Sequence, residues 1–177
     1  PNGERSHSLE PEMKTHTIRA CTHYEGPMGR MLLAATDRGL AGVWFEGQRH
    51  GPDGSGWPED ARHPVLQQAV AQLAEYFSGR RQQFALPLDL QAGTPFQQSV
   101  WAALQAIPPG GTTSYAELGR RLGMPQAARA IGAAVGRNPV SIVVPCHRVL
   151  GTGGALTGYA GGLERKTALL RLEGALM

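Results

Sequence analysis

Hydrophobic and polar residues alternate in short runs along the first part of the chain. Residues 15–22, 30–36 and 39–45 have the two-residue period and the β-branched content typical of strands. Turn residues separate these runs, and the polar segment 46–60, rich in glycine and proline, indicates a surface loop. The pattern therefore predicts three short strands followed by a long connection.

A helical period follows Pro64. Apolar residues recur three or four positions apart up to Phe77, and Gly79 supplies a stop signal. Residues 82–90 then have the composition of one more strand. Together these elements predict a small α/β layer, a sheet with one helix packed against it. The apolar residues of the helix are Leu66, Val70, Leu73 and Phe77.

Helix-start signals dominate the chain beyond Gly93. Residues 94–97, TPFQ, combine a threonine cap, a proline at the first helical position and a glutamine three residues on. Residues 114–117, SYAE, form a second capping box and predict a helix to about Leu122. This part of the chain is therefore expected to be mostly helical.

Gly123 ends the second of these helices, and Pro125 begins another that is predicted over residues 125–136. Two short helices around a tight turn outline a helix-turn-helix, although many helical hairpins with this pattern bind nothing. Ile131 and Val135 share one face of the second helix, and Arg129 lies on the opposite face among alanines and glycines. Such a slim surface suits close approach to another macromolecule and equally suits tight packing against a neighbouring helix.

The amino-acid composition indicates to which broad class of protein the chain belongs. The chain has 177 residues with 41% hydrophobic and 18% charged residues, an ordinary globular balance. No apolar run approaches the roughly 20 residues that span a bilayer, so no membrane association is expected. Two cysteines are too few for a disulfide framework, which favours a cytoplasmic location. The net charge of +3 is compatible with a polyanionic partner but does not require one.

Residues 1–13 are polar and aperiodic, and we expect them to be disordered or derived from an expression tag. The change of pattern near Gly93 divides the rest into an N-terminal α/β domain, residues 14–91, and a C-terminal domain, residues 92–177.

Candidate chemistry lies in residues 143–149, VVPCHRV, where we expect Cys146 at the end of a buried strand. A free cysteine is more often a buried apolar residue than a nucleophile. A reactive thiol needs a base or a positive charge beside it, and His147 and Arg148 follow directly. A histidine adjacent in sequence does not easily face its neighbour, so a bridging water would carry the proton. A carboxylate that fixes the histidine tautomer would complete the set, and Glu164 and Glu173 are both candidates.

The segment PCHRV, preceded by RNP and followed by TGYAGG, resembles the active-site region of the O6-alkylguanine-DNA alkyltransferases, or methylated-DNA–protein-cysteine methyltransferases. Four further residues stand at the family's distances from Cys146, and the resemblance is strong over residues 94–174. These residues are Tyr115, Arg129, Asn138 and Glu173.

The resemblance implies a ribonuclease H-like N-terminal domain and a C-terminal domain with a helix-turn-helix. It implies DNA repair by a single-turnover transfer of the alkyl group from O6-alkylguanine to Cys146, with O4-alkylthymine as a second candidate substrate. His147 would act as the base through water, and Glu173 would orient His147. Tyr115 would assist the leaving purine, Asn138 would brace the turn before the cysteine, and Lys166 would lie close to the site.

Recognition of double-stranded DNA is implied in the same way. The modified base would be flipped out of the duplex, and Arg129 would take its place from a helix in the minor groove. Tyr115 would press on the adjoining phosphate. The resemblance assigns Ala128, Ala130 and Gly132 to the DNA-binding surface, and Val149, Tyr159, Ala160 and Ser141 to the substrate pocket. We expect a monomer; cooperative binding along DNA is left open.

Two positions depart from family patterns. Some members hold an N-terminal zinc ion with two cysteines, but Cys21 is alone in that half, so neither a metal nor a cofactor is expected. Ser141 stands where mammalian members have a proline, which indicates a differently shaped pocket wall. Two other functions are weighed against transfer. A lesion-sensing DNA-binding protein would lack Cys146, and a cysteine hydrolase would leave Arg129 and the helix-turn-helix unexplained.

Overall fold

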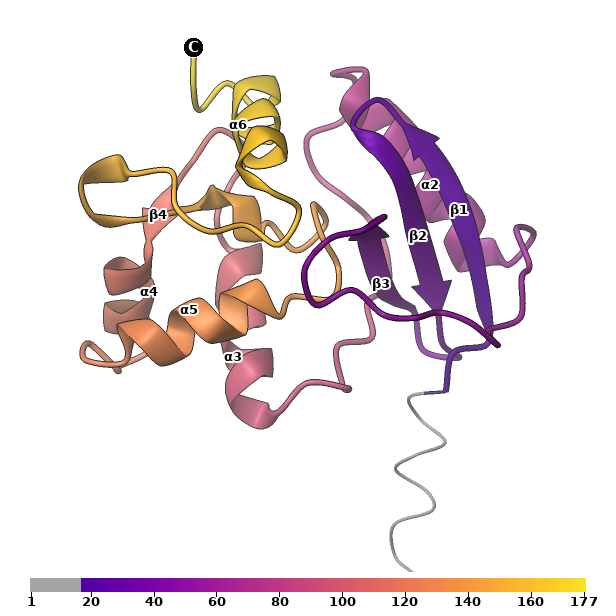
Figure 1. Ribbon diagram of the computed structural model, residues 1–177, viewed down its shortest axis with the longest axis horizontal. Coiled ribbons are helices and arrows are strands. Elements are labelled where there is room, and N and C mark those ends of the chain that lie inside the picture. Colours follow the sequence, from indigo (N-terminus) through magenta and orange to yellow (C-terminus); the bar gives the residue numbers. More distant parts are fainter. Residues whose placement is uncertain (1–16) are drawn as a thin grey trace, which may run out of the picture.

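The computed structural model describes residues 17–177, which form two lobes (Figure 1). In the N-terminal lobe, strands β1 (Ala20–Gly26), β2 (Gly29–Ala35) and β3 (Leu40–Phe45) form an antiparallel sheet in that order. Helix α2 (Pro64–Phe77) packs on one face of this sheet. Met31, Leu33 and Leu73 are fully buried between the two layers. The predicted α/β layer is therefore confirmed.

The C-terminal lobe is mostly helical, as the sequence predicts. A short parallel pair of strands crosses it and connects the helical hairpin to the segment after Cys146. In chain order its elements are α3 (Pro95–Gln105), β4 (Thr113–Ser114), α4 (Tyr115–Arg121), α5 (Ala128–Gly136), η1 (Cys146–Arg148), β5 (Val149–Leu150), η2 (Thr152–Gly154) and α6 (Leu163–Leu172).

Both predicted capping boxes begin a helix. The Thr94 hydroxyl accepts from the Gln97 amide at 3.1 Å, and the Gln97 side chain accepts from the Thr94 amide at 3.0 Å. Ser114 accepts from the Glu117 amide at 3.1 Å and so caps α4. These short-range hydrogen bonds explain why the sequence located the starts of α3 and α4 to within a residue.

The prediction of a strand over residues 82–90 is wrong. Within this segment only Leu88 pairs with the sheet, through one bridge to Leu40. The Leu40 amide donates to the Pro87 carbonyl at 2.8 Å, and the Asp89 amide donates to the Leu40 carbonyl at 2.9 Å. Pro87 has no amide hydrogen, so the segment cannot extend this pairing into a ladder.

Two boundaries near the predicted site also differ from expectation. Helix α5 begins at Ala128 instead of Pro125, because the Ala127 amide closes a turn onto the Met124 carbonyl at 3.1 Å. The expected buried strand before Cys146 reduces to a bridge between Val43 and Val140. The chain then turns at Ile142, whose φ of 72° ends any extended run.

The same bridge connects the two lobes. The Val43 amide of β3 donates to the Pro139 carbonyl at 2.9 Å, and the Ser141 amide donates to the Val43 carbonyl at 3.0 Å. The segment that leads to Cys146 is therefore paired with the sheet of the other lobe. None of the helices in residues 17–177 is both long and apolar enough to cross a membrane.

Helices α4 and α5 form the predicted helix-turn-helix, and a close approach at Gly119 sets the turn between them. The Met124 amide donates to the Gly119 carbonyl at 2.7 Å. A Cβ atom at Gly119 would lie 2.8 Å from the Met124 carbonyl oxygen, closer than real Cβ contacts. Only glycine therefore allows the turn to pack this tightly on α4.

We expect Gly119→Ala to lower the free energy of unfolding by about 1–3 kcal/mol, because the turn must move away from the added methyl group. Denaturant unfolding measures this change. Gly136→Ala is the matched control, since a Cβ at this helical glycine meets nothing within 4 Å and alanine is the better helix former. Equal losses in the two variants would contradict the role given to Gly119.

Candidate active site

Cys146 lies at a pocket to which both lobes contribute. The pocket has a volume of about 320 Å³, within the range of small-molecule sites. The thiol residue opens the short helix η1 and is 6% exposed. Helix α5 and the segment 158–160 supply most of the wall, and Arg49 and His50 reach it from the loop after β3. A planar ligand of the size of one nucleobase can therefore reach a largely buried sulfur.

His147 and Glu173 form a buried pair beside Cys146. Nε2 of His147 lies 2.7 Å from Oε2 of Glu173, and the two side chains are 0% and 2% exposed. Because an ionised carboxylate only accepts hydrogen bonds, Nε2 carries the proton and Nδ1 is left as an acceptor. Nδ1 is buried and has no hydrogen-bond partner among the described residues. The histidine therefore has one nitrogen fixed and the other available to take up a proton.

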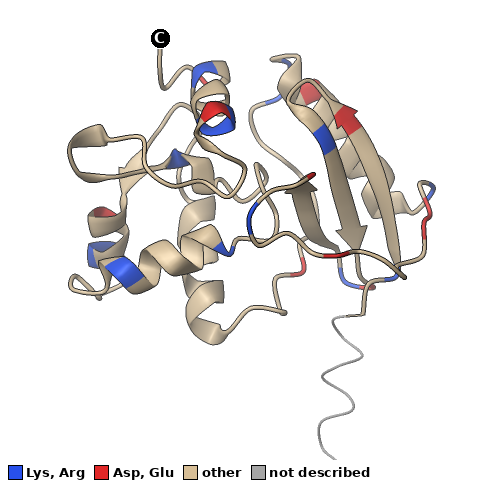
Figure 2. Cartoon of the chain, in the orientation of Figure 1, with Lys and Arg blue, Asp and Glu red and all other residues tan. Residues whose placement is uncertain are grey.

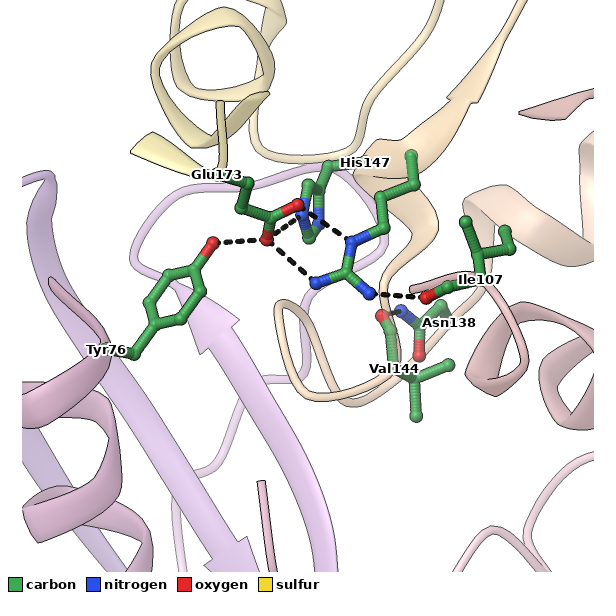
Figure 3. A network of polar contacts seen from close by, with 7 residues as sticks. Tyr76, Ile107, Asn138, Val144, His147 and Glu173 are labelled. Atoms are coloured by element: carbon green, nitrogen blue, oxygen red, sulfur yellow. Dashed lines mark hydrogen bonds and ion pairs between the residues drawn. The ribbon is translucent and has the colours of Figure 1, made fainter. Parts of the chain in front are cut away.

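Glu173 is the centre of a wider polar network (Figure 3). Arg148 donates through Nε to Oε1 at 2.8 Å and through Nη2 to Oε2 at 2.9 Å, and its Nη1 donates to the Ile107 carbonyl at 2.6 Å. From the N-terminal lobe, the Tyr76 hydroxyl donates to Oε2 at 2.6 Å. Of the two candidate carboxylates, Glu173 therefore pairs with His147, whereas Glu164 is exposed at the start of α6.

The charges in this network follow from burial and hydrogen bonding. Burial raises the pKa of Glu173, but the hydrogen bonds from His147 and Arg148 outweigh it and lower the pKa to about 2. Burial, together with the charges of Arg148 and Lys166, lowers the pKa of His147 against the raising effect of Glu173, so the imidazole is neutral at pH 7. Burial also raises the pKa of the Cys146 thiol, against the hydrogen bond of Asn138 and the charge of Lys166. The resting cysteine is thus a thiol that needs a base.

Asn138 and Lys166 hold the backbone around the cysteine from behind the pocket. Asn138 donates to the Val144 carbonyl at 2.7 Å and accepts from the Val140 amide at 3.0 Å, which closes the turn through Ile142. Lys166 is fully buried and donates to three carbonyls, those of Val149, Thr157 and Gly158, at 2.6, 2.8 and 3.1 Å. Desolvation lowers its pKa to about 8. Both side chains therefore act through the backbone that they fix.

The pocket wall brings together several residues that the sequence analysis selected, namely Tyr115, Gly132, Tyr159 and Ala160. Burial and the neighbouring Cys146 raise the pKa of Tyr115, so its hydroxyl remains a donor. Ser141 and Val149, expected in the pocket, are buried outside its lining. The Val149 carbonyl instead accepts from Lys166.

Three of the four DNA-facing residues expected on α5 are exposed, and the fourth, Gly132, is half-buried and lines the pocket. Ala128, Arg129 and Ala130 lie at its N-terminal end, and Ile131 and Val135 on the other side are buried. Figure 2 shows α5 without acidic positions and with a basic one near that end. The helix thus packs on the core with its apolar face and presents a slim surface with one long cationic side chain.

Three residues of the N-terminal lobe that the sequence analysis did not single out lie at the site: Tyr76 in the Glu173 network, and Arg49 and His50 at the pocket. Tyr76 follows the buried position Leu73 by three residues on α2, a spacing that predicts only a core aromatic residue. Arg49 and His50 occur in a polar loop without a motif. No local signal in the sequence identifies any of them.

Comparison with known proteins is consistent with this geometry over nearly the whole chain. Residues 95–175 match the DNA-binding domain of 6-O-methylguanine DNA methyltransferase, and residues 20–90 match its ribonuclease-like domain. The methylated-DNA–protein-cysteine methyltransferase of Mycolicibacterium paratuberculosis is 48% identical over 84% of this chain and 88% of its own. The enzyme of the same name from Methanosarcina acetivorans is 44% identical, over 86% and 96% of the two chains.

A solved structure shows the same arrangement. Mycobacterium tuberculosis OGT, crystallised in complex with DNA, superposes with a TM-score of 0.81 at 44% identity. The match covers 88% of this chain and 93% of that one. The family resemblance and the fold class expected from the sequence are therefore confirmed.

Because the pKa of Glu173 is low in the folded chain, the free energy of unfolding depends on pH in the acid range. The carboxyl is more acidic in the folded chain than its ordinary value of 4.5, so its contribution is complete above about pH 4.5 and is lost as the pH falls towards 2. We expect the free energy of unfolding to drop by about 3 kcal/mol over this window from Glu173 alone. Denaturant unfolding at a series of pH values measures it.

Glu173→Gln should flatten this dependence and, at neutral pH, destabilise the fold by about 3 kcal/mol, because it leaves Arg148 without its anion. Glu164→Gln changes an exposed carboxylate at the start of the helix that Glu173 follows, and should keep the wild-type slope. If the Glu173→Gln protein lost stability with falling pH as steeply as the wild type, the pH dependence would have to come from another group.

Proposed function

The chain belongs to the 6-O-methylguanine DNA methyltransferase family, and we propose the following roles for its residues in the family's reaction. The protein is a methylated-DNA–protein-cysteine methyltransferase: it repairs DNA by transferring the alkyl group of O6-alkylguanine directly to a cysteine of its own. We assign Cys146 as the acceptor. The observation that carries this assignment is the buried pair His147–Glu173 beside Cys146, with Nδ1 of His147 unpartnered among the described residues.

Cys146 requires deprotonation before it attacks, because its burial favours the thiol. The proton passes through a water molecule to Nδ1 of His147, and Glu173 stabilises the imidazolium. The sulfur then attacks the alkyl carbon in line with the bond to O6. As the S–C bond forms, the C–O6 bond breaks and its electron pair goes to the guanine, which takes up a proton. The net result is a thioether at Cys146 and an unmodified guanine.

The pocket recognises the guanine through its backbone and its aromatic wall. Tyr115 donates a hydrogen bond to the leaving purine, and Tyr159 covers one side of the base. The carbonyl of Cys146 accepts from the 2-amino group, and the Ala160 amide donates to O6. Asn138 and Lys166 support these groups through the turn before Cys146 and the carbonyl of Val149. Ser141 shapes the buried wall behind Cys146.

We propose that DNA binds to the helix-turn-helix lobe, since residues 95–175 match a DNA-binding domain and the similar M. tuberculosis protein was crystallised with DNA. We propose that α5 enters the minor groove, where the small residues Ala128, Ala130 and Gly132 allow close approach. Arg129 fills the space of the flipped nucleotide, and Tyr115 presses on the adjoining phosphate. We further propose that the protein acts as a monomer in the cytoplasm.

Two alternative functions fit the site less well. A lesion sensor without chemistry does not need a base paired with a carboxylate beside a cysteine. A cysteine hydrolase would use the same three groups but form a thioester that water cleaves. A thioether has no carbonyl for water to attack, so the stoichiometry of the reaction distinguishes hydrolysis from transfer.

We expect one equivalent of product per protein molecule, since Cys21, the other cysteine, lies on β1 of the N-terminal lobe. With excess O6-methylguanine DNA, product should plateau at one equivalent, and peptide mass spectrometry should find the methyl group on Cys146. Cys146→Ser should bind the lesion without transfer, because a hydroxyl is far harder to ionise than a thiol. Continued turnover, or a methyl group on another residue, would refute the assignment.

Arg129→Ala should slow repair of duplex DNA by about a hundredfold or more, because flipping costs a few kcal/mol in unstacking and unpairing. Reaction with the free modified base should change little. Arg171→Ala, which removes an exposed charge from α6, is the matched control and should repair duplex DNA normally. Equal losses on both substrates would mean that Arg129 serves the transfer step and not the flipping of the base.

A further inference from the structure

Tyr76 brings a hydroxyl from the N-terminal lobe to the carboxylate that pairs with His147. Its oxygen lies 2.6 Å from Oε2 of Glu173, and Figure 3 marks this contact with a dashed line. The residue is 2% exposed, and its ring packs on Phe77 and Phe84 with centroids 5.4 Å away in each case. Burial and the adjacent Glu173 raise the pKa of Tyr76, so its hydroxyl remains a donor. A rigid donor therefore points at the carboxylate from outside the catalytic lobe.

Oε2 of Glu173 is shared by three donors. It accepts from Tyr76, from Nε2 of His147 at 2.7 Å and from Nη2 of Arg148 at 2.9 Å, whereas Oε1 accepts from Nε of Arg148 at 2.8 Å. A carboxylate oxygen offers about two lone-pair directions, so the donors on Oε2 compete. The forked contact of Arg148 sets the plane of the carboxylate. Tyr76 and His147 then share the oxygen that fixes the histidine tautomer.

We propose that Tyr76 is a positioning residue for alkyl transfer, through which the N-terminal lobe holds Glu173 against His147. This inference rests on the roles proposed above for Cys146, His147 and Glu173. The hydroxyl keeps Oε2 of Glu173 facing the imidazole of His147. By donating to the same oxygen, it also weakens the attraction of Oε2 for the proton on Nε2. The N-terminal lobe thereby takes part in activating a thiol that belongs to the other lobe.

The loss of this hydroxyl has a predictable electrostatic effect. The titratable and charged groups around Glu173 are His147, Arg148 and Tyr76, and those around His147 are Glu173, Arg148 and Lys166. Without the Tyr76 donor, Oε2 accepts more strongly from Nε2 and raises the pKa of His147. Because the reaction needs neutral His147, the decline of the rate on the acid side moves to higher pH. The carboxylate also loses one of its restraints, which slows transfer at every pH.

The test compares Tyr76→Phe with the wild-type protein in single-turnover transfer from O6-methylguanine duplex and from the free base O6-benzylguanine, across about pH 5–9. We expect about a tenfold slower transfer from both substrates at neutral pH, since the lost hydrogen bond is to a charged group. The acid side of the profile should shift upwards, and DNA affinity should not change. Tyr24→Phe is the matched control, because Tyr24 packs on Phe77 but makes no contact with Glu173 among those identified.

A double-mutant cycle separates this inference from the proposed function. In the Glu173→Gln background, Tyr76→Phe should cost little, because the hydroxyl acts only through the carboxylate. If Glu173→Gln transfers at the wild-type rate, the roles of His147 and Glu173 fail. If Glu173→Gln transfers slowly but Tyr76→Phe transfers at the wild-type rate, only the inference about Tyr76 fails. The same conclusion follows if Tyr76→Phe slows transfer by the same factor in the wild-type and the Glu173→Gln backgrounds.

A third measurement remains informative even if the substitution to phenylalanine unfolds the protein. Difluorotyrosine at position 76 keeps the shape and the hydroxyl but makes it a stronger donor. The acid side of the pH profile should then shift to lower pH, opposite to the shift for Tyr76→Phe. A rate profile that keeps its wild-type position with difluorotyrosine would overturn the proposal.

Discussion

A single buried carboxylate organises the site. Glu173 carries its charge at 2% exposure because four hydrogen bonds from three side chains replace the water that burial removes. Those donors come from α2 and from η1, and the carboxylate itself follows α6. The ion pair with Arg148 is therefore a structural requirement for a buried charge at this position. The tautomer of His147, the orientation of η1 and the contact between the lobes all depend on it.

The cysteine is presented by a turn that local preferences oppose. The residues before it are β-branched and favour a strand, yet Ile142 adopts a φ of 72°. Asn138 compensates by hydrogen-bonding to both ends of the turn, at Val140 and Val144. Strain of this kind persists only where the surroundings determine the conformation. Here the surroundings are the Asn138 side chain and the bridge to Val43 in the sheet.

The sequence predicts what short-range interactions decide. Capping by Thr94 and Ser114 locates two helices, and the spacing of the motif around Cys146 identifies the family. The strand expected before Cys146 fails because Asn138 and the sheet override the preference of its valines. Pro87 similarly prevents the strand expected over residues 82–90. Tyr76 escapes notice because its partner lies 97 residues away, and an aromatic residue on an apolar helix face carries no sign of a polar role. Contacts between lobes are not encoded by any local pattern.

The pairing of β3 with the C-terminal lobe affects whether the N-terminal lobe could be made as a separate fragment. Bridges cover both outer strands of the sheet. Glu59 pairs with β1 from its own lobe, and β3 pairs with Leu88 of its own lobe and with Val140 of the C-terminal lobe. An N-terminal fragment made alone would keep the bridges to Glu59 and Leu88 and lose the bridge to Val140. The backbone amide and carbonyl of Val43 would then be open to the strands of other molecules, next to buried apolar residues of the lobe. The C-terminal lobe therefore also covers a part of the sheet edge at which another chain could pair.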